Sequence, residues 1–295
     1  MHATAVSRSP LVLAGGLLTL IRPRQWVKNV FVIAPLIFAG EFLNFASIEK
    51  VLLATLIFCI ASSATYIVND LHDIERDRRH PLKSKKRPLA SGQVGVSSAV
   101  ALLLALYGLL VVAWVLLPTV VYVVLGYMLL NLAYTFVLKH QPVIDIFTIA
   151  MGFVLRVYAG ATALAVPVSS WMFVTTLCLA LYLAAVKRRQ ELASNGSESR
   201  EVLQHYTPQL IDRYAEMAAT GALLFYSLFV MTARPEMVMT IPLVLYGLYR
   251  YWFIVEAKEA GESPTDALLN DWQLLLTVAV WGGVSAYAIW PSSPV

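Results

Sequence analysis

The 295-residue sequence is poor in charge, and this scarcity excludes most water-soluble folds. Only 14% of the residues are Asp, Glu, Lys or Arg, whereas 59% are hydrophobic. A soluble domain averages about 25% charged residues and roughly half apolar ones. Both deviations indicate that lipid is the solvent, so we predict an integral membrane protein.

Cysteine and low-complexity sequence are also scarce. Cys59 and Cys178 are the two cysteines, and each lies in an apolar run, where a thiol behaves as a small hydrophobe. We therefore predict no disulfide, redox or metal role for either. The sequence shows no room for a separate soluble domain, so we expect a single membrane domain over residues 1–295.

What the chain has in abundance is apolar runs that match the roughly 17 to 25 residues of a transmembrane helix. They predict an all-α bundle of about nine transmembrane helices. The expected spans are 29–45, 51–69, 97–116, 119–137, 143–163, 169–187, 216–232, 238–256 and 272–290. The shorter run 10–21 predicts an interfacial helix, with a signal peptide as the alternative.

Basic residues sort between the two faces that alternating helices create. Lys50 and Arg234 fall on one face, Arg156 lies within a span, and the other Lys and Arg residues lie on the opposite face or in the arm 1–28. The positive-inside rule makes the crowded face cytoplasmic. We therefore expect a multi-pass protein of the plasma (inner) membrane whose active-site loops, 70–96 and 188–215, face the cytoplasm.

Three acids mark the first of these loops. Asp70, Asp73 and Asp77 are spaced i, i+3, i+7, so a continuous helix would place them on one face at the end of a span. Such crowded carboxylates repel one another unless a cation lies among them. Their oxygens suit Mg²⁺, which completes its shell with phosphate oxygens, so we predict a magnesium and phosphate site. Ordinary ion pairs with Arg76 or Arg78 at a solvated helix end are the alternative.

Basic residues follow the acids and can hold phosphate oxygens directly. We assign Lys83 and Arg87 to the substrate site, while binding of anionic lipid headgroups is the alternative for most of this stretch. Asp145 and Arg156 are also candidates, because an ionisable residue within a span usually has a function. Eleven residues apart on one helix, they can share a cavity but cannot pair directly.

The segment NDLHDIERDRRHPLKSKKRPLASG, residues 69–92, resembles the first Asp-rich motif of the UbiA superfamily of intramembrane prenyltransferases. The resemblance covers essentially the whole chain. The arm RPRQWVKN (22–29), the dipeptide His80–Pro81 and the segment KRRQEL (187–192) are most similar to one branch, the decaprenyl-phosphate phosphoribosyltransferases.

This resemblance implies Mg²⁺-dependent transfer of phosphoribose from phosphoribosyl diphosphate to a polyprenyl phosphate. Asp70, Asp73 and Asp77 would hold the metal, and Asp73 and Asp77 would be essential to catalysis. Other members carry a second DxxxD motif, whereas this chain has Lys187, Arg188 and Glu191 there. The cations are expected to contact a donor phosphate, with simple capping of the helix end as the alternative.

The remaining expected substrate contacts come from the arm and from side chains close to the two loops. They are Arg22, Lys28 and Asn29 for the lipid phosphate, and Tyr66, Asn69 and Tyr182 beside the charged motifs. No nucleic-acid partner is expected, and the oligomeric state is left open. Two other functions compete: transfer of a prenyl group from its diphosphate to an aromatic acceptor, and an anion transporter or channel.

Overall fold

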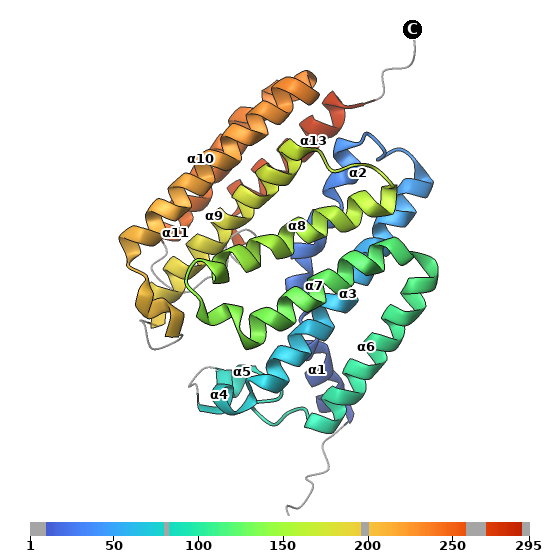
Figure 1. Ribbon diagram of the computed structural model, residues 1–295, viewed down its shortest axis with the longest axis vertical. Helices are drawn as coiled ribbons and strands as arrows, with labels where there is room; N and C mark the ends of the chain where they lie inside the picture. Colours follow the sequence, from blue (N-terminus) through green and yellow to red (C-terminus); the bar gives the residue numbers. More distant parts are fainter. Residues whose placement is uncertain (1–9, 80–82, 196–200, 258–269, 291–295) are drawn as a thin grey trace, which may run out of the picture.

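The computed structural model describes residues 10–79, 83–195, 201–257 and 270–290, and these residues form helices and turns without any strand (Figure 1). The dipeptide His80–Pro81 and parts of both charged loops lie outside them. The elements are α1 (Pro10–Leu20), η1 (Pro23–Val32), α2 (Ala34–Phe38), α3 (Phe45–His72), α4 (Ile74–Arg79), α5 (Lys83–Lys86), α6 (Val96–Leu116), α7 (Pro118–Phe136), η2 (Leu138–His140), α8 (Ile144–Leu164), α9 (Ser170–Asn195), η4 (Glu201–His205), α10 (Pro208–Ala233), η5 (Pro235–Thr240), α11 (Ile241–Ala257) and α13 (Trp272–Ala288), where η denotes a 3₁₀ segment.

Seven helical segments in the described part of the chain are long and apolar enough to cross a membrane, and α13 is a shorter apolar helix. The predicted all-α, multi-pass membrane fold is confirmed. Large apolar side chains also cover the outside of the bundle, as on α6, where Val111 and Val115 are 65% and 82% exposed. Such a surface suits contact with lipid tails.

The predicted first span, 29–45, is wrong in detail. The chain there forms the end of η1, the five-residue helix α2 and a turn at Gly40, whose φ of 76° favours glycine. Asn44 then caps α3, because its side-chain oxygen accepts hydrogen bonds from the backbone N–H groups of Ala46 and Ser47. No single helix of spanning length forms before α3 in the described residues.

The N-terminal helix α1 is part of the fold. It packs on α3 and α6, and Leu20 is 1% exposed. Gly16 lets this helix approach the α5–α6 connection, since a Cβ atom there would lie 2.6 Å from a methyl group of Val94. The expected separate helix over 10–21 is therefore present.

Helix α8 lies at the centre of the bundle, with α7 on one side and α9 on the other (Figure 1). It also packs on α3, η1 and α2. Gly160 makes one of these contacts possible, because a Cβ atom at this position would lie 1.9 Å from the carbonyl oxygen of Val32. The two charged segments both contact the region where α8 begins: Arg188 of α9 pairs with Asp145 of α8, and Asp73 after α3 pairs with Lys139 of η2.

Candidate active site

The helix that carries the acid motif breaks inside it. α3 ends at His72, Asp73 adopts φ −92° and ψ 7°, and α4 begins at Ile74. The expected single face with three carboxylates therefore does not form. Asp70 and Asp77 turn to one group of partners, and Asp73 turns to another.

Asp70 and Asp77 are held by arginines. Nη1 of Arg87 donates to Oδ1 of Asp70 at 2.8 Å and also to Oδ2 of Asp77. Nη2 of Arg22 lies 2.5 Å from the same Oδ1 of Asp70. Both carboxylates are almost fully buried, whereas the two arginines keep about a quarter of their side-chain surface exposed. Two carboxylates thus surround one guanidinium nitrogen.

Asp73 faces different cations. Lys139 of η2 donates from Nζ to Oδ1 of Asp73 at 3.3 Å, and Nδ1 of His72 lies 3.0 Å from the same oxygen. Burial raises the pKa of Asp73, but the His72 hydrogen bond and the Lys139 charge outweigh it, so the pKa lies below its ordinary value. The Asp73 carboxylate is therefore ionised at neutral pH.

The arm bends sharply so that Arg22 reaches the acids. Arg22 has φ 54° and ψ 61°, a left-handed conformation uncommon for a residue other than glycine. Its guanidinium carbon lies 5.0 Å from the centre of the Tyr66 ring. Asn69 lies one residue before Asp70, and its Oδ1 is 3.5 Å from the hydroxyl of Thr135. Arg22 and Tyr66 thus lie together beside the acid motif that Asn69 begins, and their role in substrate binding stays a prediction.

The rest of the arm is tied to α3. Trp26 donates to the Ser63 hydroxyl at 3.0 Å, and that hydroxyl donates to the carbonyl of Ile21 at 2.8 Å. Asn29 is 0% exposed, and its amide lies 3.1 Å from the sulfur of Cys59. Asn29 therefore holds the arm inside the protein instead of presenting its amide to a lipid phosphate. Lys28, its half-buried neighbour, stays the arm's candidate for that role.

Arg156 is buried beneath the arm and is 4% exposed. Its Nε donates to Asn29 at 2.8 Å and its Nη1 to the carbonyl of Gly152 at 2.7 Å. Its guanidinium also lies about 5 Å from the ring centres of Phe58, Tyr127 and Phe153. These contacts give the cation a structural role, and Arg156 and Asp145 do not pair with each other.

The second charged segment is also largely internal. Arg188 and Asp145 are both 0% exposed, and Nε of Arg188 lies 2.6 Å from Oδ2 of Asp145. Arg188 also donates from Nη1 to Glu191 and from Nη2 to the hydroxyl of Tyr134 at 2.8 Å. The hydroxyl of Tyr206 completes the cluster by donating to Oδ1 of Asp145 at 2.7 Å. Arg188 and Asp145 are thus brought together, without a surface that a substrate can touch.

The structure places two further predicted substrate contacts, Lys187 and Tyr182, in different environments. Lys187 is 36% exposed and lies 3.8 Å from Glu191, so it stays a candidate for contact with a donor phosphate. The Tyr182 hydroxyl donates to the carbonyl of Leu248 at 3.1 Å, and its ring packs on Tyr251 and Trp252. Tyr182 belongs to the core between α9 and α11. Lys83 lies on the short helix α5.

The acid motif has the oxygen donors that a divalent cation needs, but in the described structure its three carboxylates are not arranged around a common point. In the described residues, no three His, Cys, Asp or Glu side chains form a group that could hold a metal. Carboxylate oxygens are nevertheless the donors that Mg²⁺ prefers, and Asp70 and Asp77 already converge on a single cationic nitrogen. The residues therefore suit the ion once Arg87 moves aside.

Sequence reasoning missed Lys139, Tyr134 and Tyr206. Lys139 carries the one usable signal, because it is a cation in a short connection on the crowded side of the membrane. Nothing local indicates that it meets Asp73, 66 residues earlier. The tyrosines lie in segments whose neighbours in space depend on how the helices pack.

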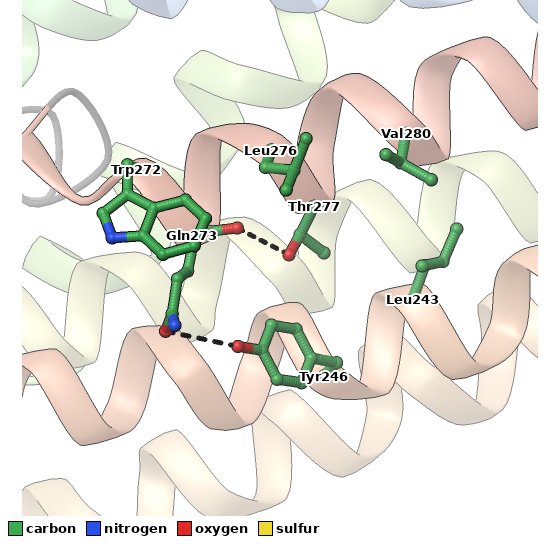
Figure 2. A pocket seen from close by; sticks show the side chains of 7 residues that line it. All are labelled: Leu243, Tyr246, Trp272, Gln273, Leu276, Thr277 and Val280. Carbon is green, nitrogen blue, oxygen red and sulfur yellow. Dashed lines mark hydrogen bonds between the residues drawn. The ribbon is translucent and has the colours of Figure 1, made fainter.

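A groove between α11 and α13 lies apart from these charges (Figure 2). Its volume is about 330 Å³, and it is lined by Leu243, Tyr246, Trp272, Gln273, Leu276, Thr277 and Val280. Two of its polar side chains bond to each other, because the hydroxyl of Tyr246 lies 3.4 Å from Oε1 of Gln273. Since no charged side chain lines it, the groove suits a hydrocarbon and not a phosphate.

Comparison with known proteins agrees with this arrangement. Residues 30–272 match the model of the UbiA prenyltransferase family. The chain belongs to the UbiA family. This is a family of membrane-embedded transferases, which accounts for a charged site at one end of an apolar helical bundle.

Relatives in this family align over almost the entire length of the chain. Decaprenyl-phosphate phosphoribosyltransferase from Mycobacterium tuberculosis is 35% identical, over 95% of this chain and 96% of the relative. The protein of the same name from Mycolicibacterium smegmatis is 34% identical, over 98% and 97%. The solved structure of a UbiA homolog from Archaeoglobus fulgidus bound to GPP and Mg²⁺ superposes with a TM-score of 0.72 at 20% identity, over 93% of this chain and 99% of that one. The last comparison establishes the shared fold.

Proposed function

We propose that this protein transfers phosphoribose from phosphoribosyl diphosphate to a polyprenyl phosphate, forming polyprenyl-phosphoryl 5-phosphoribose and diphosphate. One observation carries the proposal: relatives that bear the name of this activity are about one-third identical over nearly the full length of both chains. The site's charge supports it, because both substrates are anions and the described cations gather beside the acid motif.

The donor would bind where Asp70 and Asp77, joined by Asp73 of the same motif, would hold Mg²⁺, an ion that would withdraw charge from a departing diphosphate. Arg87 and Lys187 would bind donor phosphate oxygens through charge-assisted hydrogen bonds. Arg22 and Lys28 of the arm would bring the lipid phosphate close despite its repulsion by the donor. The new bond joins an oxygen of that phosphate to carbon 1 of the ribose, and the bond from this carbon to diphosphate breaks.

This reaction needs no strong general base. A phosphate monoester has a second pKa near 6, so the acceptor is largely ionised at neutral pH. Positioning and charge neutralisation by the chain's cations would provide most of the rate enhancement. The active site would face the cytoplasm, since the basic residues gather on that side by the positive-inside rule.

Incubation of the purified protein with two substrate pairs tests the proposal. The first pair is phosphoribosyl diphosphate with a polyprenyl phosphate, and the second is a prenyl diphosphate with aromatic acids. We expect lipid-linked pentose phosphate from the first pair, its loss on chelation by EDTA and its return with Mg²⁺. Prenylated aromatic products, or no product from the first pair, would overturn the assignment.

A matched variant ties the activity to the acid motif. Asp73→Asn removes the charge that faces Lys139 and should abolish turnover, whereas Glu75→Gln changes an acid that is 74% exposed on α4 and should retain it. Equal activity of the two variants would separate the reaction from the acid motif.

A further inference from the structure

The groove between α11 and α13 has an uncharged wall and the length of one lipid chain (Figure 2). Its polar groups are engaged with one another, since the hydroxyl of Thr277 donates to the carbonyl of Gln273 at 2.7 Å. From Trp272 to Val280 the α13 side of the groove is about 12 Å long, at the rise of an α-helix. One leaflet of the hydrocarbon core of a bilayer is about 15 Å thick. The groove therefore matches an acyl chain of a lipid that occupies one leaflet.

An arginine lies at one end of this groove. Arg250 follows Tyr246 by one turn of α11, and Asp271 directly precedes Trp272 of α13, so the pair lies beside two lining residues. Nε and Nη2 of Arg250 donate to the two carboxylate oxygens of Asp271 at 3.1 and 2.7 Å. Nη1 makes no hydrogen bond to the described residues, and the Arg250 side chain is 25% exposed. The second edge of the guanidinium fork is therefore available to an anionic acceptor.

Exposed aromatic side chains place this arginine at the level of the lipid headgroups. Phe253 and Trp272 are 58% and 68% exposed, and the guanidinium carbon of Arg250 lies 5.3 Å from the centre of the Phe253 ring. Aromatic and basic side chains gather at the interface between membrane and water. Glu256, farther along α11, lies 2.7 Å from Arg189 of α9, so this is the end of the bundle that carries the charged segments. A lipid with its phosphate at Arg250 would extend its chain toward the middle of the bilayer.

We propose that the groove between α11 and α13 is a binding site for an anionic phospholipid. One acyl chain lies along the uncharged wall, and the phosphate of the same lipid accepts charge-assisted hydrogen bonds from the second edge of Arg250. A zwitterionic headgroup fits less well, because its ammonium group would face the same guanidinium. The lipid fastens α13 to α11 and takes no part in group transfer, since the groove lies apart from the acid motif.

Titration of the delipidated full chain with two lipids, read by native mass spectrometry, tests the phosphate contact. The lipids are phosphatidylglycerol and a diacylglycerol with the same acyl chains. The wild type should bind phosphatidylglycerol about tenfold more tightly, the difference expected for a hydrogen bond to a charged group. Arg250→Gln should abolish this preference and leave the affinity for diacylglycerol unchanged. Equal affinity of the wild type for the two lipids would overturn the proposal.

Two controls keep the arginine variant interpretable. Asp271 accepts a hydrogen bond from the N–H of Leu274 at 2.9 Å, so it still caps α13 when Arg250 is replaced. Arg213→Gln removes an exposed cation from α10, away from the groove, and should keep the full preference for phosphatidylglycerol. Loss of the preference in Arg213→Gln as well would show a general attraction of anionic lipid to a basic protein and would refute a site at Arg250.

A pair of valines on α13 tests the chain contact. Val280 lines the groove and is 40% exposed, whereas Val278 is 46% exposed and does not line it. Val280→Phe should weaken binding of both lipids at least about fivefold, as expected when a filled site is overpacked, and Val278→Phe should not. Unchanged affinities in Val280→Phe would refute the groove as the site of the chain.

The same titration identifies other occupants of the groove. Excess polyprenyl phosphate should leave the binding of phosphatidylglycerol unchanged. Displacement of the phospholipid by polyprenyl phosphate would assign the groove to the lipid substrate and overturn the proposal. A wild-type dimer that Val280→Phe dissociates would overturn it too, because the groove would then bind a second copy of the chain.

Discussion

Nε of Arg156 lies 2.8 Å from Oδ1 of Asn29, so the middle of α8 is bonded to the arm that precedes all the long helices. The two residues are 127 positions apart in the sequence. No carboxylate of the described residues forms an ion pair with Arg156, and aromatic ring faces surround its charge instead. The arm is therefore fixed by a cation whose partners are all neutral.

Arg156→Lys should destabilise the protein. The substitution keeps the charge but removes at least one of the hydrogen bonds to Asn29, Gly152 and Tyr127, at a cost of about 2 kcal/mol. Thermal unfolding in detergent measures the change. Arg24→Lys, at an exposed position of the same arm, should leave the melting temperature unchanged. Equal melting temperatures for both variants would contradict the structural role of Arg156.

Gly160→Ala should loosen the arm from α8. The new methyl group would lie 1.9 Å from the Val32 carbonyl oxygen, and because both partners are backbone, one element must move. We expect a loss of about 3 kcal/mol, seen as a lower melting temperature. Gly126→Ala is the matched control on α7, where no atom lies within 4 Å, and it should stabilise by up to about 1 kcal/mol.

Asp70→Asn should lower the free energy of unfolding by about 3–5 kcal/mol, because it breaks a buried ion pair, and it should also reduce turnover, because Asp70 is a proposed metal ligand. Asp70 is the common partner of Arg22 and Arg87, so its loss leaves two cations facing a neutral amide. The rate of product formation and the melting temperature should both fall. A stable variant with normal turnover would show that the arm and the acid motif need no common carboxylate.

Lys187 and Arg189 are two residues apart on α9 but should respond differently to alanine. Lys187→Ala should raise the KM for phosphoribosyl diphosphate about tenfold, through loss of a charge-assisted contact. Nη2 of Arg189 lies 2.7 Å from Glu256, so Arg189→Ala should instead loosen the packing of α9 on α11 and lower the melting temperature. A raised KM for Arg189→Ala and a normal one for Lys187→Ala would reverse the assignment.

The long helices were predictable because their signal is local. An apolar run such as 51–69 is long enough by itself to predict a helix in lipid. The observed helix α3 contains this run and extends from Phe45 to His72. The prediction of one spanning helix over 29–45 was wrong because the segment is apolar on average, although Pro35 and the turn at Gly40 interrupt it. In that segment the choice of backbone conformation depends on packing against α8, which no local pattern contains.

The site was predictable in composition and less so in geometry. The charged residue types indicated where the site lies along the chain, and most of them gather at one end of the bundle. The partner of each charge was not predictable, because Arg22 and Asp70 or Lys139 and Asp73 meet only after the helices pack. Lys187 and its neighbour Arg188 are both cations of one motif, but Lys187 is partly exposed whereas Arg188 is fully buried, and the sequence did not predict this difference.

The arginine nitrogen shared by Asp70 and Asp77 also bears on how the protein is made. The chain provides its own counter-charges, so the electrostatic repulsion at the end of α3 is relieved before any ligand arrives. The packing of these two acids at the end of α3 therefore needs no metal ion as a counter-charge. A newly synthesised molecule therefore carries its own counter-charge at this end of the bundle, and under the proposed function the donor and Mg²⁺ would displace Arg87 from the two acids.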